Sequence, residues 1–230
     1  MGEKLVSLYL DGSLVVGDFN KDISDIDLVA VISSEINKSE FRALKKMHAD
    51  FVGRHPSWYD RIEVCYITIE ALKHPQLSGY PIVNISPGEP IHKIKTKKEW
   101  LMNWYLTREK ALALFGPPIK EIIVPISKNE FIESVKDHIR SWEKWLGSMR
   151  ERRGQVAYAV LSLCRALYAV KNRDQASKLK ACRWVATNFP AWAGLIKKAK
   201  SWRASKMGSV DDTTYQEVVQ FLKFVQKETL

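Results

Sequence analysis

Long hydrophobic runs are missing from this sequence of 230 residues. No apolar run approaches the ~20 residues that a membrane-spanning helix needs, so the sequence predicts no membrane partner. Cysteine is scarce, and Cys65, Cys164 and Cys182 are too scattered to form a disulfide framework or a zinc site. The five histidines do not have the spacing of metal ligands either. We therefore expect a soluble, cytoplasmic protein.

Signatures of several common enzyme classes are also absent. The chain has no Walker A motif, no dinucleotide-binding fingerprint and no serine-hydrolase elbow. Its 46% apolar and 27% charged residues are ordinary for a globular protein, which excludes the disordered, collagenous and coiled-coil classes. The length allows one large domain or two modest ones.

Positive charge is distributed unevenly along the chain. Residues 1–126 contain 16 Lys and Arg and 16 Asp and Glu, whereas residues 127–230 contain 20 and 10. The whole formal net charge of +10 therefore lies in the second part. A basic half of this kind suits a polyanion such as nucleic acid or nucleotide phosphates, or is simply a well-solvated helical surface.

The hydrophobic period changes at the same point of the chain. The first part alternates strand-like and helix-like segments, with strands expected at 5–10, 26–32 and 61–69 and helices at 39–52 and 97–115. Ser39 or Asn37 is the expected N-cap of the first helix. The second part has apolar residues at three- and four-residue steps, which predict helices at 131–146, 155–170, 177–188, 192–204 and 213–226. We expect an α+β fold, with a small mixed-sheet domain and its helices at 1–126, followed by an all-α helical bundle at 127–230.

Two acidic residues open the most hydrophobic of these strands. Asp25 and Asp27 are two residues apart, so both project from the same face, about 6.5–7 Å apart along the strand. Two like charges repel each other there, and burying either one without a partner is costly. Mg²⁺ suits such a pair, because it takes oxygen ligands and commonly bridges one or two carboxylates to substrate phosphates.

Gly12-Ser13, at the end of the first strand, provides the second part of the predicted site. A glycine after a strand lets backbone N–H groups approach a phosphate closely, and the serine hydroxyl adds one more donor. A polar loop connects this turn to the two aspartates. The sequence therefore predicts a phosphate-binding turn next to a pair of metal ligands.

Glu63 provides a third acid on the next strand, where Glu63, Cys65 and Ile67 share one face. If that strand pairs beside Asp25 and Asp27, Glu63 can complete a metal shell or take the proton from an attacking hydroxyl. Each element alone is commonly an ordinary turn or a solvated acid. Their conjunction in this order predicts a catalytic site.

The Gly12-Ser13 and Asp25-Ile26-Asp27 motifs resemble the signature of the DNA polymerase β-like nucleotidyltransferases. Within that superfamily the chain is most similar to the aminoglycoside nucleotidyltransferases of the streptomycin/spectinomycin adenylyltransferase type. Phe115-Gly116-Pro117-Pro118 resembles their helix-then-Gly-Pro segment, and residues 161–168 (LSLCRALY) resemble the first helix of their C-terminal bundle. The similarity covers nearly the whole chain and is strongest at the catalytic motif.

This resemblance implies the reaction and the role of each residue. It implies Mg²⁺, as two ions, and ATP as the co-substrate, whose AMP would move to a hydroxyl of an aminoglycoside or aminocyclitol antibiotic with release of pyrophosphate. Such an activity confers antibiotic resistance. The implied site comprises Asp25, Asp27 and Glu63 for metal binding and catalysis, with Glu63 as the general base, and Gly12, Ser13 and Lys178 for the nucleotide.

Several positions depart from the pattern of the relatives, among them Leu179, which stands where an acidic residue is common. Leu167 stands where streptomycin-modifying members carry tryptophan, so a spectinomycin-like acceptor is favoured, and Asp11 stands where an aromatic residue or histidine is usual. Two other functions remain open from the sequence. One is the same chemistry on a protein or RNA acceptor, and the other is a nucleic-acid-binding protein with an inactive catalytic domain, which the basic second part would suit.

Overall fold

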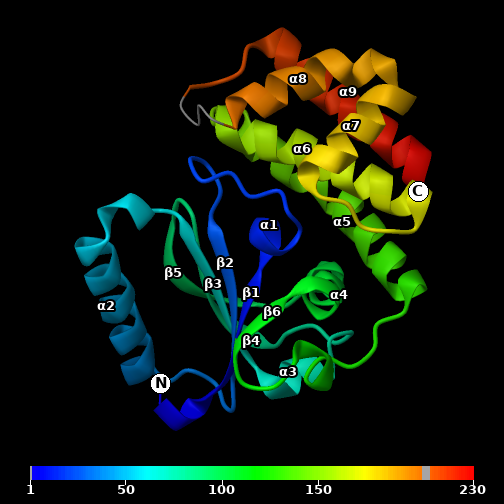
Figure 1. Ribbon diagram of the computed structural model, residues 1–230. Helices are drawn as coiled ribbons and strands as arrows, with labels where there is room; N and C mark the ends of the chain where they lie inside the picture. The colour runs from blue at the N-terminus through cyan, green and yellow to red at the C-terminus, as the bar shows by residue number, and fades with distance from the viewer. Residues whose placement is uncertain (1, 204–207) are drawn as a thin grey trace. The chain divides into compact units, whose positions relative to one another are not determined.

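The computed structural model describes residues 2–203 and 208–230 (Figure 1). The chain divides into two compact units, Met1–Ile126 and Ser127–Leu230. In the described residues the first unit contains a sheet with helices on both faces and the second contains only helices, which confirms the expected α+β class. Over the same residues, no helix combines the length and the apolar character needed to cross a membrane.

The described strands of the first unit form one six-stranded mixed sheet in the order β5-β4-β3-β2-β1-β6. They are β1 (Leu5–Asp11), β2 (Ile26–Ile32), β3 (Ile62–Thr68), β4 (Pro81–Ser86), β5 (Glu89–Lys95) and β6 (Leu112–Phe115). Strands β2 and β3 are parallel, and all other neighbours are antiparallel. The helical segments of this unit are α1 (Gly12–Val15), α2 (Lys38–Arg54), α3 (Ile69–Lys73), α4 (Leu101–Lys110), η1 (Gly2–Lys4), η2 (Pro56–Trp58), η3 (Lys98–Trp100) and η4 (Ile119–Glu121).

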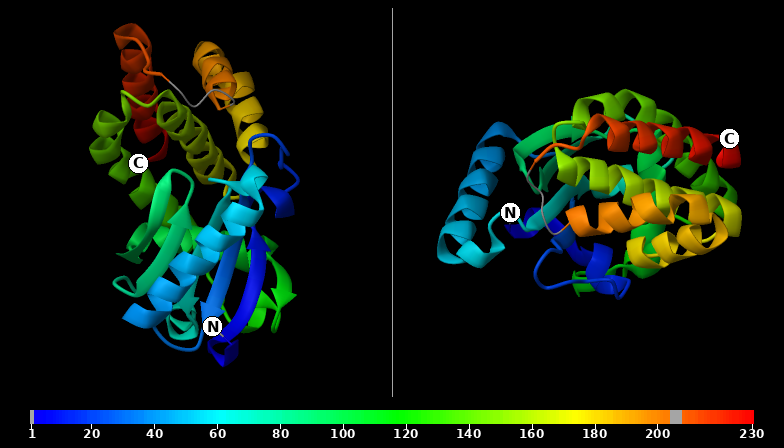
Figure 2. Two further views of the ribbon diagram at one scale, coloured as in Figure 1. Left: turned by 90° about the vertical axis from the view of Figure 1, so that its left-hand side faces the viewer. Right: turned by 90° about the horizontal axis from the view of Figure 1, so that it is seen from above.

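Alternating side chains give this sheet two apolar faces, each covered by helices. Helix α2 lies along one face, where Leu44 packs into a core with Val64 and Tyr66 of β3 (Figures 1 and 2). Helices α3 and α4 cover the other face, where Leu72 and Trp104 join a separate core. The central strands β2 and β3 are therefore buried between the two layers of helices, whereas the edge strands β5 and β6 are largely exposed.

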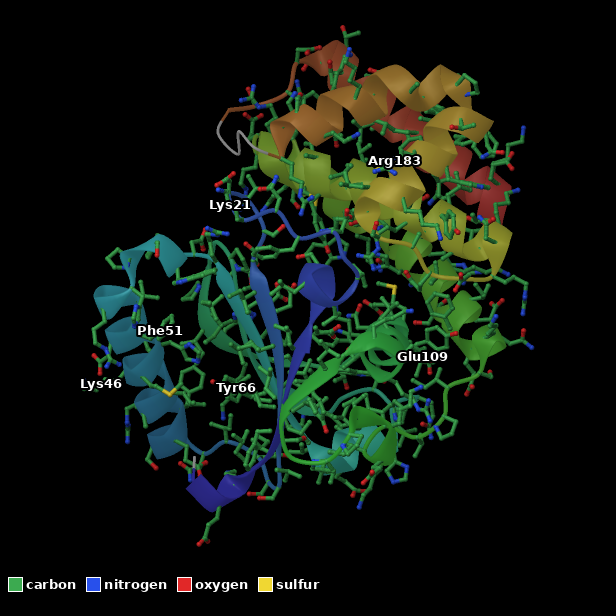
Figure 3. The ribbon with its side chains drawn as sticks, in the orientation of Figure 1. Lys21, Lys46, Phe51, Tyr66, Glu109 and Arg183 are labelled. Atoms are coloured by element: carbon green, nitrogen blue, oxygen red, sulfur yellow. The ribbon has the colours of Figure 1, made fainter. Side chains whose placement is uncertain are left out.

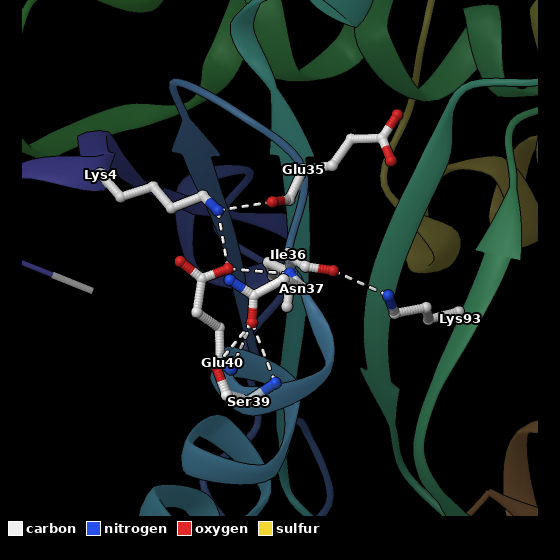
Figure 4. Close-up of polar contacts among 7 residues, drawn as sticks. All are labelled: Lys4, Glu35, Ile36, Asn37, Ser39, Glu40 and Lys93. Atoms are coloured by element: carbon white, nitrogen blue, oxygen red, sulfur yellow. Dashed lines mark hydrogen bonds and ion pairs between the residues drawn. The ribbon is translucent and has the colours of Figure 1, made fainter.

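Helix α2 begins at a capping box (Figure 4). The Asn37 side chain accepts hydrogen bonds from the backbone N–H groups of Ser39 at 2.9 Å and Glu40 at 3.0 Å, and the Glu40 carboxylate accepts from the Asn37 N–H at 2.8 Å. Lys4 also donates to Glu40 at 2.7 Å, and these bonds lower the pKa of the Glu40 carboxyl. Asn37 is thus confirmed as the N-cap.

His48 connects α2 to the sheet through a hydrogen bond of 2.8 Å between its Nε2 and the Tyr66 hydroxyl. The two elements can be found in Figure 3 by the labelled residues Tyr66 on β3 and Phe51 on α2. Burial lowers the pKa of His48 and raises the pKa of Tyr66 to about 12. A histidine whose folded-state pKa lies below its unfolded value of about 6.5 stabilises the fold above that pH and loses the contribution as the pH falls.

We therefore expect the free energy of unfolding to fall more steeply below about pH 6.5 in the wild type than in His48→Gln, since glutamine does not titrate. Urea unfolding at a series of pH values from 7.5 to 5 measures both slopes. If the free energy of unfolding depends on pH equally in the two proteins, the pKa of His48 is not lowered by folding.

Residues 97–115 do not form the single helix expected from the sequence. Helix α4 ends at Lys110, and Leu112–Phe115 is the edge strand β6, whose Ala113 pairs with Tyr9 of β1. Leucine and alanine are good helix formers, so the local pattern cannot reveal a strand that is set by pairing with a distant segment. Gly116 has φ +81°, and a Cβ there would lie 2.4 Å from the Val6 carbonyl oxygen. Gly116 therefore follows a strand and not a helix, and it lets the chain pass close to β1.

The described part of the second unit is a helical bundle built around α6 (Figure 2). Its elements are α5 (Lys128–Met149), α6 (Arg153–Asn172), α7 (Lys178–Asn188), η5 (Pro190–Trp192), α8 (Ala193–Trp202) and α9 (Asp212–Thr229). Helix α6 packs against α5, α7, α8 and α9, and its large buried surface explains its mostly apolar sequence. All five predicted helices are confirmed, although the predicted end of the fourth at Ala204 lies outside the described residues.

Candidate active site

The register of the sheet places three carboxylates in one row, which we call the acid row. Asp27 on β2 lies opposite Glu63 in the parallel pair with β3 and opposite Asp11 in the antiparallel pair with β1. Residues directly opposite each other on adjacent strands have side chains on the same face, about 4.5–5.5 Å apart at Cβ. The acid row, Asp11-Asp27-Glu63, therefore crosses three adjacent strands at the end of the sheet beside α1 (Figure 1).

The acid row continues the sheet face that packs against α3 and α4. Tyr9, Val29 and Cys65, two residues further into the same strands, belong to the core on that face. Burial raises the pKa of the Cys65 thiol, and the negative charges of Glu63 and Asp11 raise it further. Cys65 is therefore neutral at physiological pH and has no role as a nucleophile.

Gly12 lies directly against Asp27. Its φ of +67° is in the left-handed region, and a Cβ at this position would lie 1.8 Å from Oδ2 and 2.4 Å from Cγ of Asp27. Only glycine lets the backbone approach the carboxylate so closely. The Gly12-Ser13 segment forms the start of α1, a single helical turn, so the structure brings the expected phosphate-binding turn and the acids together.

Asp25 follows a loop whose shape is fixed by its own hydrogen bonds. Ser24 is 2% exposed, and its hydroxyl accepts from the backbone N–H of Asn20 at 2.9 Å. Arg61, just before β3, donates from Nη2 to the carbonyl oxygens of Lys21 at 2.6 Å and Ser24 at 2.7 Å; Figure 3 labels Lys21. Arg61 thus ties the segment before β2 to the segment before β3, and the Oδ1 atom of Asp25 is buried beside them.

The chemistry of the predicted ligands fits Mg²⁺ bound together with a phosphate. Asp25, Asp27 and Glu63 offer only oxygen donors, which this ion prefers. Among residues 2–203 and 208–230, no group of three or more His, Cys, Asp or Glu side chains is arranged to hold a metal ion by itself. Mg²⁺ usually takes one or two protein carboxylates and completes its shell with water and substrate phosphates, so a pair of aspartates is sufficient.

Lys178, the remaining predicted site residue, is the first residue of α7 in the second unit. Its ammonium nitrogen lies 5.1 Å from the centre of the Tyr158 ring, within the range of a cation–π contact. The Ser177 hydroxyl caps the helix by accepting from the Lys180 N–H at 3.2 Å. The role of Lys178 as a phosphate contact remains a prediction.

Two residues that organise the site could not be found by sequence reasoning. Thr107 contacts Asp11 from α4, although the two are 96 residues apart in the chain. Arg61 acts through main-chain oxygens of a loop that precedes it by 37 to 40 residues. Neither residue belongs to a motif, so only the folded chain reveals them.

Known proteins resemble this chain over its whole length. Residues 121–228 match the family model described as "Aminoglycoside adenylyltransferase, C-terminal domain". The chain is 24% identical over 248 aligned residues to an "Aminoglycoside (3'') (9) adenylyltransferase" of Rhizobium radiobacter, with 100% of this chain and 85% of the relative covered. Its fold is similar to the crystal structure of spectinomycin adenyltransferase AAD(9) from Enterococcus faecialis with ATP and spectinomycin, with a TM-score of 0.73, 17% identity, and 99% and 92% of the two chains covered.

The two sequence similarities identify the chain as a nucleotidyltransferase, and the similar solved structure shows that it shares that fold. The resemblance to the aminoglycoside nucleotidyltransferases is confirmed, and residues 121–228 carry the C-terminal domain of the aminoglycoside adenylyltransferases.

Proposed function

We propose that this enzyme transfers AMP from Mg-ATP to a hydroxyl of an aminoglycoside or aminocyclitol antibiotic, with a spectinomycin-like acceptor favoured over streptomycin. The observation that carries the proposal is the strand register, which sets Asp27 beside Glu63 while Gly12 touches the Asp27 carboxylate. The relative from Rhizobium radiobacter is named an adenylyltransferase, and the similar solved structure is described with ATP and spectinomycin. A cytoplasmic location remains part of this proposal.

In this proposal the acids bind the metal ions and the turn binds the triphosphate of the nucleotide. Asp25 and Asp27 hold the magnesium ions, for which two is the proposed number. When bound, Mg²⁺ offsets the negative charge that develops on the α-phosphate and on the departing pyrophosphate. The Gly12-Ser13 turn contacts the triphosphate with backbone N–H groups and the serine hydroxyl, and Lys178 is a further proposed contact.

Glu63 is the proposed general base. It is half-buried and lies directly across from Asp27, so it is next to a metal ligand and can also contribute to the metal shell. Its carboxylate takes the proton of the acceptor hydroxyl while the hydroxyl oxygen attacks the α-phosphorus in line. The bond from the α-phosphorus to the bridging oxygen breaks, and pyrophosphate leaves.

Glu63→Gln is expected to lower kcat by about 10²–10⁴-fold, the usual contribution of a general base, while the KM for ATP stays within about threefold. Steady-state measurement of pyrophosphate release gives both parameters. Glu70→Gln, at an exposed glutamate of α3, is the matched control and should behave as wild type. An equal loss in kcat and in nucleotide affinity would make Glu63 a metal ligand or a positioning group instead.

The proposed acceptor is tested with a panel of aminoglycosides and aminocyclitols, including spectinomycin and streptomycin, incubated with Mg²⁺ and each nucleoside triphosphate. Mass spectrometry is expected to show addition of one AMP to spectinomycin and less or none to streptomycin. Transfer to none of the panel would overturn the acceptor, and a preference for another nucleotide would overturn ATP as the donor.

A protein or RNA acceptor is the second candidate, and one feature of the sequence favours it. Residues 175–210 contain eight Lys and Arg and no Asp or Glu, and this stretch includes α7, where Figure 3 labels Arg183. A stretch of this basic composition attracts polyanions, whereas an aminoglycoside is a cation. Steeply salt-dependent binding of RNA, together with no transfer to any drug, would favour this candidate.

A further inference from the structure

Asp11 is the member of the acid row that the proposed mechanism does not use. Both of its carboxylate oxygens accept hydrogen bonds from the protein. Oδ1 accepts from the backbone N–H of Gly12 at 2.8 Å, and Oδ2 accepts from the Thr107 hydroxyl at 2.5 Å. Asp11 is therefore directed at the turn and at α4, and each of its carboxylate oxygens accepts a hydrogen bond from the protein.

Thr107 is held firmly by the helix that carries it. It is 1% exposed, and its Oγ1 also lies 3.0 Å from the carbonyl oxygen of Asn103, one turn earlier in α4. A hydroxyl has one proton to donate, and a carboxylate is the stronger of these two acceptors. Trp104 of the same helix is 3% exposed in the sheet core, so Asp11 is anchored to a packed element.

We propose that Asp11 and Thr107 form a positioning pair that fixes the Gly-Ser turn against Asp27. The contacts run from Thr107 to Asp11, from Asp11 to the Gly12 N–H, and from the Gly12 backbone to the Asp27 carboxylate. The inference rests on the proposed function, because the turn is the part expected to receive the triphosphate. A turn released from α4 would change both the direction of its N–H groups and the space beside Asp27.

Three variants separate positioning from simple structural support. Thr107→Val removes the hydroxyl but keeps the shape of the side chain, and Thr107→Ser keeps the hydroxyl. Thr96→Val is the matched control, because Thr96 is 4% exposed and its hydroxyl accepts from the Tyr80 N–H at 3.1 Å, away from the acid row. Thermal unfolding is expected to show a similar loss of stability for both valine variants, since each removes one buried hydrogen bond.

Binding of Mg-ATP and the KM for ATP are expected to distinguish them. Thr107→Val should weaken Mg-ATP binding and raise the KM for ATP, each by about tenfold, with kcat changed less than about threefold. In Thr107→Ser and Thr96→Val, all three quantities should stay within about twofold of wild type. Equal nucleotide affinity in Thr107→Val and Thr96→Val would overturn the positioning role.

A second measurement needs no substrate. Asp11-Gly12 is the single Asp-Gly step of the chain. Labelling aspartate carbonyls with ¹³C and glycine with ¹⁵N therefore gives one backbone signal, which belongs to Gly12. Thr107→Val is expected to shift this signal and to speed exchange of the Gly12 amide by about tenfold, and Thr96→Val should leave it in place. An unmoved signal in Thr107→Val would overturn the proposal.

These two measurements also separate the inference from the function on which it rests. If the wild type binds Mg-ATP but modifies no drug, the proposed acceptor fails, and nucleotide affinity and the Gly12 signal still decide the role of the pair. If the wild type does not bind Mg-ATP, the proposed function is overturned, and the Gly12 signal alone decides whether Asp11 and Thr107 fix the turn.

Discussion

Replacement of Asp27 by asparagine is expected to abolish nucleotidyl transfer while the protein remains folded. The change keeps the volume of the side chain but removes one negative charge from the middle of the acid row, between Asp11 and Glu63. Metal-derived stabilisation of a phosphoryl transition state is worth several kcal/mol, and its loss corresponds to a rate decrease of about a thousandfold or more. Removing one of three adjacent like charges also relieves repulsion, so the fold should tolerate the variant.

The Asp27→Asn variant is measured by mass spectrometry of the modified acceptor and by thermal unfolding. Asp22→Asn is its control, because Asp22 is an exposed residue of the loop that leads to β2. We expect wild-type transfer from the control and none from Asp27→Asn at equal folded protein. Transfer within tenfold of wild type in Asp27→Asn would remove this residue from the site.

Gly12→Ala is expected to have the second largest effect, for two separable reasons. The first is conformational, because a left-handed backbone costs an L-residue roughly 1–2 kcal/mol. The second is steric, since the added Cβ would overlap Asp27, with only 1.8 Å to Oδ2. Either the carboxylate or the turn must move, and a shift of about 1 Å at a reacting centre can lower the rate about a hundredfold.

Gly79→Ala isolates the steric term. Gly79 also has a positive φ, at +96°, but a Cβ there would have no atom within 4 Å. It precedes β4 at the end of the sheet away from the acid row, because β4 runs antiparallel to β3. Both alanine variants should lose stability, but only Gly12→Ala should lose about a hundredfold in transfer rate per folded molecule. Transfer rates within threefold of each other would mean that the turn adapts without disturbing Asp27.

Local sequence was enough to predict the elements whose cause is local. The β-branched run at 26–32 is strand β2 with the same bounds, and the Asn37 cap marks the start of α2. Pairing between distant segments was not predictable in this way. Leu112–Phe115 has a helical composition yet joins the sheet edge beside β1, and the β4–β5 hairpin was not anticipated, although Pro87-Gly88 between its strands is a turn signal.

In the candidate site too, residue spacing along one strand was predictable from the sequence, whereas the pairing between strands was not. A spacing of two predicts that Asp25 and Asp27 share a face, and the same parity groups Glu63 with Cys65. It does not say which strand lies next to which, so the juxtaposition of Asp27 and Glu63 follows only from the parallel register of β2 and β3. Thr107 lies beyond any such argument, since its contact with Asp11 depends on how α4 packs on the sheet.

The hydrogen bonds of Arg61 have a practical consequence for engineering. Arg61 binds the carbonyl oxygens of Lys21 and Ser24, which every amino acid at those positions would provide. The side chains at 21 and 22 are exposed and can therefore be randomised without removing this anchor. A library confined to these two positions would vary the exposed side chains of the loop that leads to β2 while the backbone stays tied to Arg61, so this short loop is a place where new side chains can be introduced without loosening the segment before Asp25.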